Sequence, residues 1–277
     1  MIGLHLQNPA PYVILAAIEM SRPNEKQRSI AHGQDAEHHG RTTPHLRGRG
    51  LHAGRTPAME FRAVLFDLDG TLLDTLADIA GAANAALERL GFPPHPVENY
   101  RYLVGDGAGC LARRVLGEAG NDEAMVERCR LAIAEEYQAR WSQNTRAYAG
   151  IAELLAGLEA RGVPMVVLSN KPHDATTAVV DFFFPDRPFR VVRGAQPGVP
   201  IKPDPTAALQ IARELSIEPG RFIYLGDTDT DMRTAVAAGM FPAGALWGFR
   251  TAGELTASGA RVLLKTPREL LALLAGR

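Results

Sequence analysis

Short apolar runs alternate with segments of helical periodicity from Phe61 onward, and this alternation restricts the folds that the chain can adopt. The apolar runs are FRAVLFD (61–67), VPMVVLSN (163–170), FRVVRG (189–194) and RFIYLGD (221–227). Helices are expected between or after them, over 151–161, 174–183, 205–215 and 230–238. Strands that are apolar on both faces and separated by helices indicate a parallel sheet covered on each side. The sequence therefore predicts an α/β fold with a Rossmann-like, doubly wound parallel sheet.

A helical insertion interrupts this alternation after the first strand. We expect a core made of residues 59–75 and 147–277, and an inserted helical part made of residues 76–146. No convincing strand falls inside the insertion, whose helical periodicity covers residues 76–90, 108–116 and 122–141.

Residues 1–58 have a different composition from the remainder of the chain. They hold six of the eight histidines, with scattered Arg, Gly and Pro and little sustained periodicity, and this predicts a disordered extension. The EHHG motif at 37–40 is a weak candidate for metal capture, because no second ligand cluster lies at a fixed spacing from it. Since Met59 directly precedes the first strand, we hypothesise that translation begins there.

The overall charge excludes some classes of partner. Lys plus Arg number 30 and Asp plus Glu 31, giving a formal charge of −1, so no global basic field favours nucleic acid or an anionic membrane. The apolar stretch YVILAAI (12–18) is far shorter than the roughly 20 residues of a membrane-spanning helix. Basic residues first appear after it, unlike in a secretory signal. Cys110 and Cys129 lack metal-ligand spacing, and we expect them to serve packing. We expect a cytoplasmic protein, either a monomer or a homodimer.

Polar side chains gather where the predicted strands end, and the carboxyl ends of parallel strands are where such sheets bind ligands. In chain order they are Asp67 and Asp69, Ser169 with Asn170, Lys202, and Asp227 with Asp231. Taken alone, a D-x-D motif is often a turn and a single lysine is usually solvated. Four such features in order, each at or just after a strand end, are hard to produce by helix capping or surface polarity. They are therefore expected to converge on one crevice.

The residue types in this crevice indicate phosphoryl chemistry. If the backbone stays extended after Phe66, Asp67 and Asp69 point to the same side. Clustered carboxylates raise one another's pKa, so an ionised cluster implies a cation, and hard oxygen ligands favour Mg²⁺, which completes its shell with substrate phosphate. Lys202 and the hydroxyls of Thr71 and Ser169 can donate to phosphoryl oxygens.

These motifs together resemble the haloacid dehalogenase-like hydrolase superfamily, in its phosphatase branch. The likeness rests on FDLDGTLLDT (66–75), Ser169 in VVLSNKP, Lys202 in IKPDP and the run LGDTDTD (225–231). The resemblance implies that Asp67 is the nucleophile that forms an aspartyl-phosphate and that Asp69 is the general acid and base.

The resemblance also implies the remaining roles in the site. Mg²⁺ would be held by Asp67, the Asp69 backbone carbonyl and Asp227, with Asp231 in the outer shell. The phosphoryl oxygens would be held by Thr71, Ser169, Asn170 and Lys202. Because halide needs no proton when it leaves, Asp69 favours a phosphatase over a dehalogenase.

The insertion occupies the position of the family's helical cap, which excludes water and selects the substrate. Its loop VGDGAGCLARR (104–114) combines three glycines with Arg113 and Arg114. One interpretation is a flexible loop whose arginine, Arg113, reaches the non-phosphate end of the substrate. The other is a plain interhelical turn with solvated arginines.

Within the superfamily the chain is most similar to the phosphoglycolate phosphatases, through the cap loop, the SNKP motif and the stretch ALWGFRTAGEL (245–255). This implies a Mg²⁺-dependent phosphatase acting on a small phosphorylated metabolite, with 2-phosphoglycolate as the leading candidate. A pyrophosphatase or a sugar-phosphate phosphatase or mutase of the same superfamily is the alternative. A non-catalytic binding protein is disfavoured, because every catalytic carboxylate and the motif lysine are present.

Overall fold

A parallel sheet in the strand order β5-β4-β1-β6-β7-β8 forms the centre of the molecule. The computed structural model describes residues 60–186 and 189–274. The sheet strands are β1 Ala63–Phe66, β4 Met165–Pro172, β5 Phe189–Ala195, β6 Phe222–Gly226, β7 Phe241–Ala245 and β8 Val262–Leu264. Every pairing in this sheet is parallel, which confirms the predicted α/β class. Expectations for residues 1–58 and for a start at Met59 fall outside the described residues.

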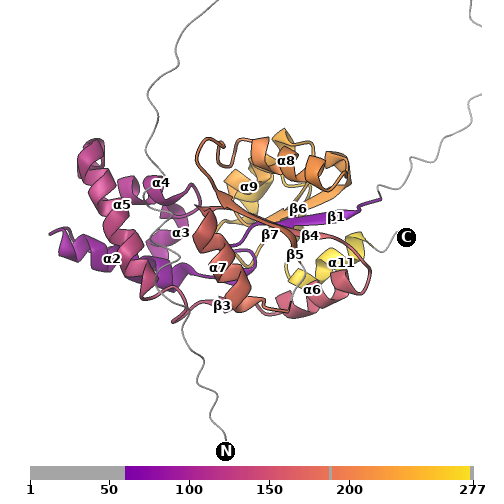
Figure 1. Cartoon of the computed structure of the whole chain (residues 1–277), viewed down its shortest axis with the longest axis horizontal. Helices are drawn as coiled ribbons and strands as arrows, with labels where there is room; N and C mark the ends of the chain where they lie inside the picture. Colours follow the sequence, from indigo (N-terminus) through magenta and orange to yellow (C-terminus); the bar gives the residue numbers. More distant parts are fainter. Residues whose placement is uncertain (1–59, 187–188, 275–277) are drawn as a thin grey trace, which may run out of the picture.

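Helices cover both faces of the sheet (Figure 1). On one face lie α6 Ile151–Glu159, α7 His173–Phe183 and α11 Leu270–Leu273, and on the other α8 Thr206–Glu214 and α9 Asp229–Ala237. The buried strand β1 serves both layers, because alternate side chains of a strand point to opposite faces. Val64 and Phe66 pack into one hydrophobic cluster and Ala63 and Leu65 into the other. A run that is apolar on both faces is what such a central strand requires.

The sheet is wider than the sequence predicts. It includes β7 and β8 in addition to the four predicted strands. The β7 run, FPAGA, contains a proline and a glycine, which are uncommon inside strands, and β8 is only 3 residues long. Both therefore give a weak local signal. Helix α10 Ala252–Ala257 lies between them in the chain.

Residues between the short strands β2 Leu73–Asp74 and β3 Arg146–Ala147 form the helical part of the molecule, at the left of Figure 1. The two strands pair antiparallel, so the chain leaves and re-enters the core at one place. The inserted helices are α2 Leu76–Arg89, α3 Tyr100–Leu103, α4 Ala108–Val115 and α5 Glu123–Gln138. They share a hydrophobic cluster, which Phe249 of the core joins. We call this part the cap.

A buried carboxylate ties the two chain segments that join the cap to the core. Asp78, in the first turn of α2, accepts hydrogen bonds from the Asn144 and Thr145 backbone N–H groups at 3.0 and 2.8 Å. The Thr145 hydroxyl and the Asn144 side-chain amide donate to it as well, at 2.8 and 2.9 Å. Asp78 thus fixes where the second segment lies relative to the first.

The loop between α3 and α4 lies against the core. Asp106 accepts a hydrogen bond from the Thr230 hydroxyl at 2.6 Å, and the Gly105 carbonyl accepts one from the Asn170 side chain at 3.0 Å. Arg101 of α3 donates to the Gly248 carbonyl at 2.9 Å. These contacts hold the cap over the carboxyl ends of the strands.

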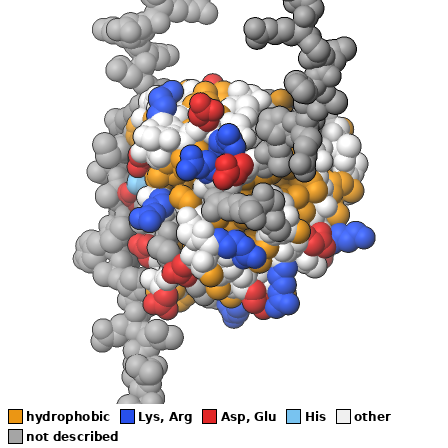
Figure 2. All heavy atoms as spheres, turned by 90° about the vertical axis from the view of Figure 1, so that its right-hand side faces the viewer, with side chains coloured by type: hydrophobic (Ala, Val, Ile, Leu, Met, Phe, Trp, Pro, Cys, Tyr) orange, Lys and Arg blue, Asp and Glu red, His pale blue; other side chains and the backbone are white. Residues whose placement is uncertain are grey.

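The surface shows no field of one sign on the face drawn in Figure 2, where basic and acidic side chains are interspersed. This agrees with the near-zero net charge. Across residues 60–186 and 189–274, none of the helices combines the length and the apolar character needed to cross a bilayer.

Candidate active site

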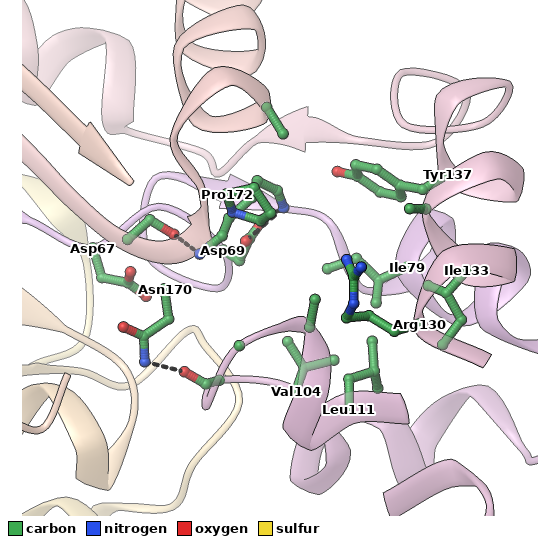
Figure 3. A pocket seen from close by; sticks show the side chains of 17 residues that line it. Asp67, Asp69, Ile79, Val104, Leu111, Arg130, Ile133, Tyr137, Asn170 and Pro172 are labelled. Carbon is green, nitrogen blue, oxygen red and sulfur yellow. Dashed lines mark hydrogen bonds and ion pairs between the residues drawn. The ribbon is translucent and has the colours of Figure 1, made fainter. Parts of the chain in front are cut away.

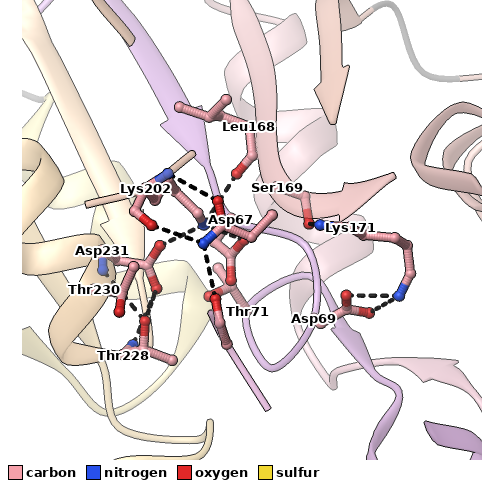
Figure 4. Close-up of polar contacts among 12 residues, drawn as sticks. Asp67, Asp69, Thr71, Leu168, Ser169, Lys171, Lys202, Thr228, Thr230 and Asp231 are labelled. Atoms are coloured by element: carbon pink, nitrogen blue, oxygen red, sulfur yellow. Dashed lines mark hydrogen bonds and ion pairs between the residues drawn. The ribbon is translucent and has the colours of Figure 1, made fainter. Parts of the chain in front are cut away.

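Asp67 directly follows the carboxyl end of β1, one of the two central strands of the sheet. Its backbone N–H donates to the Leu225 carbonyl of β6 at 2.9 Å, which extends the ladder by one residue. Its side chain is 8% exposed, and Oδ1 accepts a hydrogen bond from Lys202 Nζ at 2.7 Å (Figure 4). The first carboxylate of the D-x-D motif is therefore buried and paired.

The chain turns just after Asp67, so the condition that the backbone stays extended after Phe66 is not met. The Leu68 carbonyl accepts hydrogen bonds from the N–H groups of residues 71, 72 and 73. Gly70 adopts φ +93°, and a Cβ there would lie 2.3 Å from an Asp227 oxygen. Glycine is required on both counts. The turn sends the side chains of Asp67 and Asp69 to different lysines.

Lys202 is the cation at the base of the site. It lies in the loop after β5, is 3% exposed, and its Nζ donates to Asp67 Oδ1 and to Asp231 Oδ1, at 2.7 Å in each case. A third contact joins Nζ to the Leu168 carbonyl at 3.3 Å. Burial disfavours the charge, but the Asp231 and Asp67 carboxylates outweigh it and raise the pKa of Lys202. The lysine therefore remains charged.

Three buried carboxylates, those of Asp67, Asp227 and Asp231, offer oxygens within 4.8 Å of one another. One lysine cannot neutralise them. Burial and then the neighbouring Asp231 raise the pKa of Asp67 to about 7 although Lys202 opposes the shift. Burial and then Asp67 likewise raise the pKa of Asp227. This excess of negative charge and the all-oxygen donor set fit a hard divalent cation such as Mg²⁺.

The partners of Asp227 and Asp231 separate their roles. Asp227 accepts hydrogen bonds from the Thr71 hydroxyl at 2.7 Å and from the Phe249 N–H at 2.8 Å, which orient its carboxylate. Asp231 gives one oxygen to Lys202 and the other to Thr228, where it completes the capping box at the start of α9. Asp231 is paired with the Lys202 ammonium and Asp227 has only neutral donors, so Asp231 is suited to hold Lys202 and to remain outside a metal's inner shell.

Thr71 does not take the position expected of a phosphate ligand. Its side chain is 0% exposed, and its hydroxyl donates to Asp227. The reason is the turn after Asp67, which places the Thr71 hydroxyl against Asp227. Its carbonyl accepts a hydrogen bond from Trp247 Nε1 at 2.9 Å, which fixes the turn. In this structure Thr71 orients a carboxylate.

Asp69 is held by a lysine that sequence reasoning did not single out. Lys171 Nζ lies 2.8 and 2.7 Å from the two Asp69 oxygens and 5.0 Å from the centre of the Tyr137 ring. Burial disfavours its charge, but Asp69 and then Tyr137 outweigh it and raise the pKa of Lys171. A signal was present, because Lys171 follows Ser169 by two residues in β4 and such residues share one side of a strand.

Ser169 and Asn170 lie in the last part of β4, near the predicted strand end, but they differ in their partners. The Ser169 oxygen accepts a hydrogen bond from the Lys171 N–H at 3.2 Å, which leaves the hydroxyl proton able to donate. The Asn170 amide donates to the carbonyls of Gly105 and Lys202 and accepts from the Lys202 N–H. Asn170 thus joins the Lys202 loop to the cap loop.

A cavity of about 160 Å³ separates this polar wall from the cap (Figure 3). The core contributes Asp67, Asp69, Ser169, Asn170, Lys171, Pro172 and Ala175 to its lining. The cap contributes Ile79, Val104, Gly105, Gly107, Ala108, Leu111, Arg130, Ile133, Ala134 and Tyr137. The cavity therefore has a charged floor and a largely apolar roof.

Arg113 does not line this cavity, contrary to expectation. It lies on α4, and its guanidinium donates to Glu123 at 2.7 Å and to the Gly120 carbonyl at 2.6 Å, on the side of the helix that faces α5 and the turn before it. Arg114 pairs with Asp106. The arginine that lines the cavity is Arg130 of α5.

A buried aspartate at the end of the central strand, a second aspartate beside it and a lysine shared by two carboxylates define a class of hydrolase. The model of the haloacid dehalogenase-like hydrolase family matches residues 64–245, and the chain belongs to that family. The match begins in β1 and ends in β7, so it contains the residues of the site described above except Trp247 and Phe249.

Individual members of the family that are similar to this chain are phosphatases. The chain is 33% identical to the phosphoglycolate phosphatase of Pseudomonas putida, over 76% of this chain and 78% of that protein. It is 32% identical to the N-acetylmuramic acid 6-phosphate phosphatase of Pseudomonas aeruginosa, over 78% and 96%. The crystal structure of a predicted phosphoglycolate phosphatase from Haemophilus somnus superposes with a TM-score of 0.72 at 25% identity, covering 77% and 97%. The family and these homologues make the protein a phosphatase.

Proposed function

We propose that the protein is a Mg²⁺-dependent phosphatase that hydrolyses a small phosphomonoester, with 2-phosphoglycolate as its substrate. The observation that carries the proposal is the position of Asp67. Its buried carboxylate lines the cavity while Lys202 holds one of its oxygens at 2.7 Å. The other oxygen is left to attack a phosphoryl group bound in the cavity.

In the first step, an Asp67 oxygen attacks phosphorus, the bond from phosphorus to the leaving oxygen breaks, and an aspartyl-phosphate forms. Asp69, in its protonated form, donates its proton to the leaving oxygen, which departs as a hydroxyl group, and Asp69 becomes ionised. Lys202 neutralises charge at the base of the site, and the Ser169 hydroxyl is placed to donate to a phosphoryl oxygen.

In the second step, water attacks the phosphorus of the aspartyl-phosphate. Asp69, now ionised, accepts a proton from that water, the phosphorus–Asp67 bond breaks, and inorganic phosphate leaves with Asp67 restored. Lys171 keeps the Asp69 carboxylate in one position through both of its oxygens.

Asp67 and Asp227 would hold the metal, as would the Asp69 backbone carbonyl that the family resemblance assigns to it. Mg²⁺ bound there would supply positive charge that reduces repulsion between the Asp67 carboxylate and the phosphoryl oxygens. Asp231 contributes to the site by holding the Lys202 ammonium in position.

The size of the cavity supports a small substrate. Pockets for drug-sized ligands hold about 300–1,000 Å³, whereas this cavity is about 160 Å³. A two-carbon phosphomonoester fits such a volume better than an amino-sugar phosphate. The names of the phosphoglycolate phosphatase relatives support the same choice. A cytoplasmic location and a small phosphorylated metabolite as partner belong to this proposal, for a protein that is a monomer or a homodimer.

A substrate panel tests the proposal. Phosphate release is measured with 2-phosphoglycolate, pyrophosphate, N-acetylmuramic acid 6-phosphate and a generic phosphomonoester, with and without Mg²⁺. We expect 2-phosphoglycolate to have the highest kcat/KM and Asp67→Asn to be inactive, because asparagine is a poor nucleophile. If pyrophosphate is much the better substrate and 2-phosphoglycolate is no better than the generic ester, the substrate is wrong. Activity indifferent to both Mg²⁺ and Asp67→Asn would overturn the mechanism.

A further inference from the structure

The roof of the cavity carries a single charged side chain among its described lining residues. The cap lining is apolar at Ile79, Val104, Leu111 and Ile133, whereas Tyr137 adds a hydroxyl and Arg130 of α5 adds a charge. Figure 3 shows Arg130 among these apolar side chains of the cap, across the cavity from Asp67 and Asp69. A substrate whose phosphoryl group meets Asp67 therefore presents its other end to an apolar surface with one guanidinium.

Glu127 fixes the orientation of that guanidinium. Arg130 Nε and Nη2 each donate to one Glu127 oxygen at 2.7 Å, a two-point contact across one turn of α5. The Arg130 side chain is 16% exposed and Glu127 is 56% exposed, so the glutamate holds the arginine from the solvent side. Among the described contacts, none engages Nη1. One edge of the guanidinium is thus fixed and the other remains available to a ligand.

The charge and shape of this roof match a carboxylate. A guanidinium presents its N–H groups in a plane that suits carboxylate oxygens, and hydrogen bonds between two charged groups are the stronger kind. Apolar walls reduce the competition from water that weakens such pairs at the surface. An uncharged alcohol at the same place would gain far less, and a bulky group would meet the apolar side chains.

We propose that Arg130, positioned by Glu127, is the residue that selects substrates with a carboxylate at the end remote from phosphorus. The inference rests on the proposed function and adds the reason for its substrate class. It also replaces Arg113 as the arginine of the cap that contacts substrate. Arg130 binds the carboxylate, and Glu127 is a positioning residue.

Paired substrates test this selection. The wild-type protein, Arg130→Gln and Arg113→Gln are each assayed with 2-phosphoglycolate and with 2-hydroxyethyl phosphate, which is similar in size but has an alcohol in place of the carboxylate. We expect Arg130→Gln to lower the ratio of the two kcat/KM values by about 10- to 100-fold, while 2-hydroxyethyl phosphate is hydrolysed as before. Arg113→Gln is the matched control, because it removes another glutamate-paired arginine of the cap from outside the cavity, and it should leave the ratio unchanged.

Two further variants separate recognition from folding. Arg130→Lys keeps the charge but loses the planar fork, and should retain part of the selectivity. Glu127→Gln should raise KM for 2-phosphoglycolate without changing kcat or the KM for 2-hydroxyethyl phosphate, which a merely destabilised cap would not do.

The outcomes distinguish failure of the role proposed for Arg130 from failure of the proposed function. A wild-type protein that does not hydrolyse 2-phosphoglycolate would refute the proposed function. A wild-type protein that hydrolyses it, with an Arg130→Gln ratio equal to that of the wild type, would refute only the role of Arg130. An equal loss of selectivity in Arg113→Gln would also refute that role.

Discussion

Lys202→Met tests the charge balance of the site. Lys202 Nζ lies 2.7 Å from oxygens of both Asp67 and Asp231, and all three side chains are at least nine-tenths buried. Removing one partner of a buried ion pair typically costs about 3–5 kcal/mol, because the other charge is left uncompensated. A folded part of this size loses about 2–4 °C of Tm per kcal/mol. We therefore expect Tm to fall by roughly 6–20 °C at about pH 8 in the absence of Mg²⁺.

The loss should depend on pH, and the sign follows from the pKa of Asp67. Burial raises that pKa to about 7 in the folded protein, so the folded state binds this proton more tightly than the unfolded state does. The stability that the proton provides is complete below the unfolded pKa and is lost as pH rises through about 7. Lys202 limits that loss. Its removal should therefore lower Tm less at about pH 5 than at about pH 8.

Differential scanning calorimetry of the metal-free protein measures both values. Lys265→Met serves as the matched control, because Lys265 is exposed, and it should leave Tm within about 2 °C of the wild type. A drop in Lys202→Met that is the same at both pH values would mean that lost packing, and not charge, is responsible. A drop no larger than that of Lys265→Met would refute the reasoning.

Three more predictions concern the metal, Asp69 and the cap. Protons compete with Mg²⁺ for Asp67 at pH values below its pKa of about 7. The rise in Tm on adding Mg²⁺ should therefore be larger at about pH 8 than at about pH 5. An equal rise at both pH values would contradict the metal site. Lys171→Met removes both contacts to Asp69 and should lower kcat by about 10- to 100-fold, since misplacing a catalytic group costs rates of that order; an unchanged kcat in steady-state assays would exclude a positioning role. Asp78→Ala leaves buried donors of Thr145 unpaired and should lower the free energy of unfolding in urea by about 3 kcal/mol. A decrease below about 1 kcal/mol would show that Asp78 is not needed to tie the two segments that join the cap to the core.

The sheet and the convergence of its polar ends could be predicted because both depend on local patterns. An apolar run marks a buried strand, and parallel strands place the residues after them at one edge, where Asp67, Lys202 and Asp231 indeed meet. The position of Thr71 could not be read in the same way. It depends on the turn after β1, and a turn directs side chains by its hydrogen bonds and not by strand alternation.

The cap arginine illustrates a second limit. Helical periodicity places Arg113 and Arg130 on helices, but which side of each helix faces the core depends on how the helices pack, and that is a tertiary property. A partial signal existed, because Arg130, Ile133 and Tyr137 recur at spacings of three and four and so share one face of α5. All of them line the cavity.

The central claim is that Asp67 attacks phosphorus and carries the phosphoryl group. Rapid acid quenching of the protein during a single turnover of 2-phosphoglycolate, followed by peptide mass spectrometry, tests it directly. The account predicts a transient peptide containing residues 64–75 that is heavier by one phosphoryl group, labile to hydroxylamine and absent in Asp67→Asn. Release of phosphate without any phosphorylated peptide, or with the phosphoryl group on another residue, would contradict it.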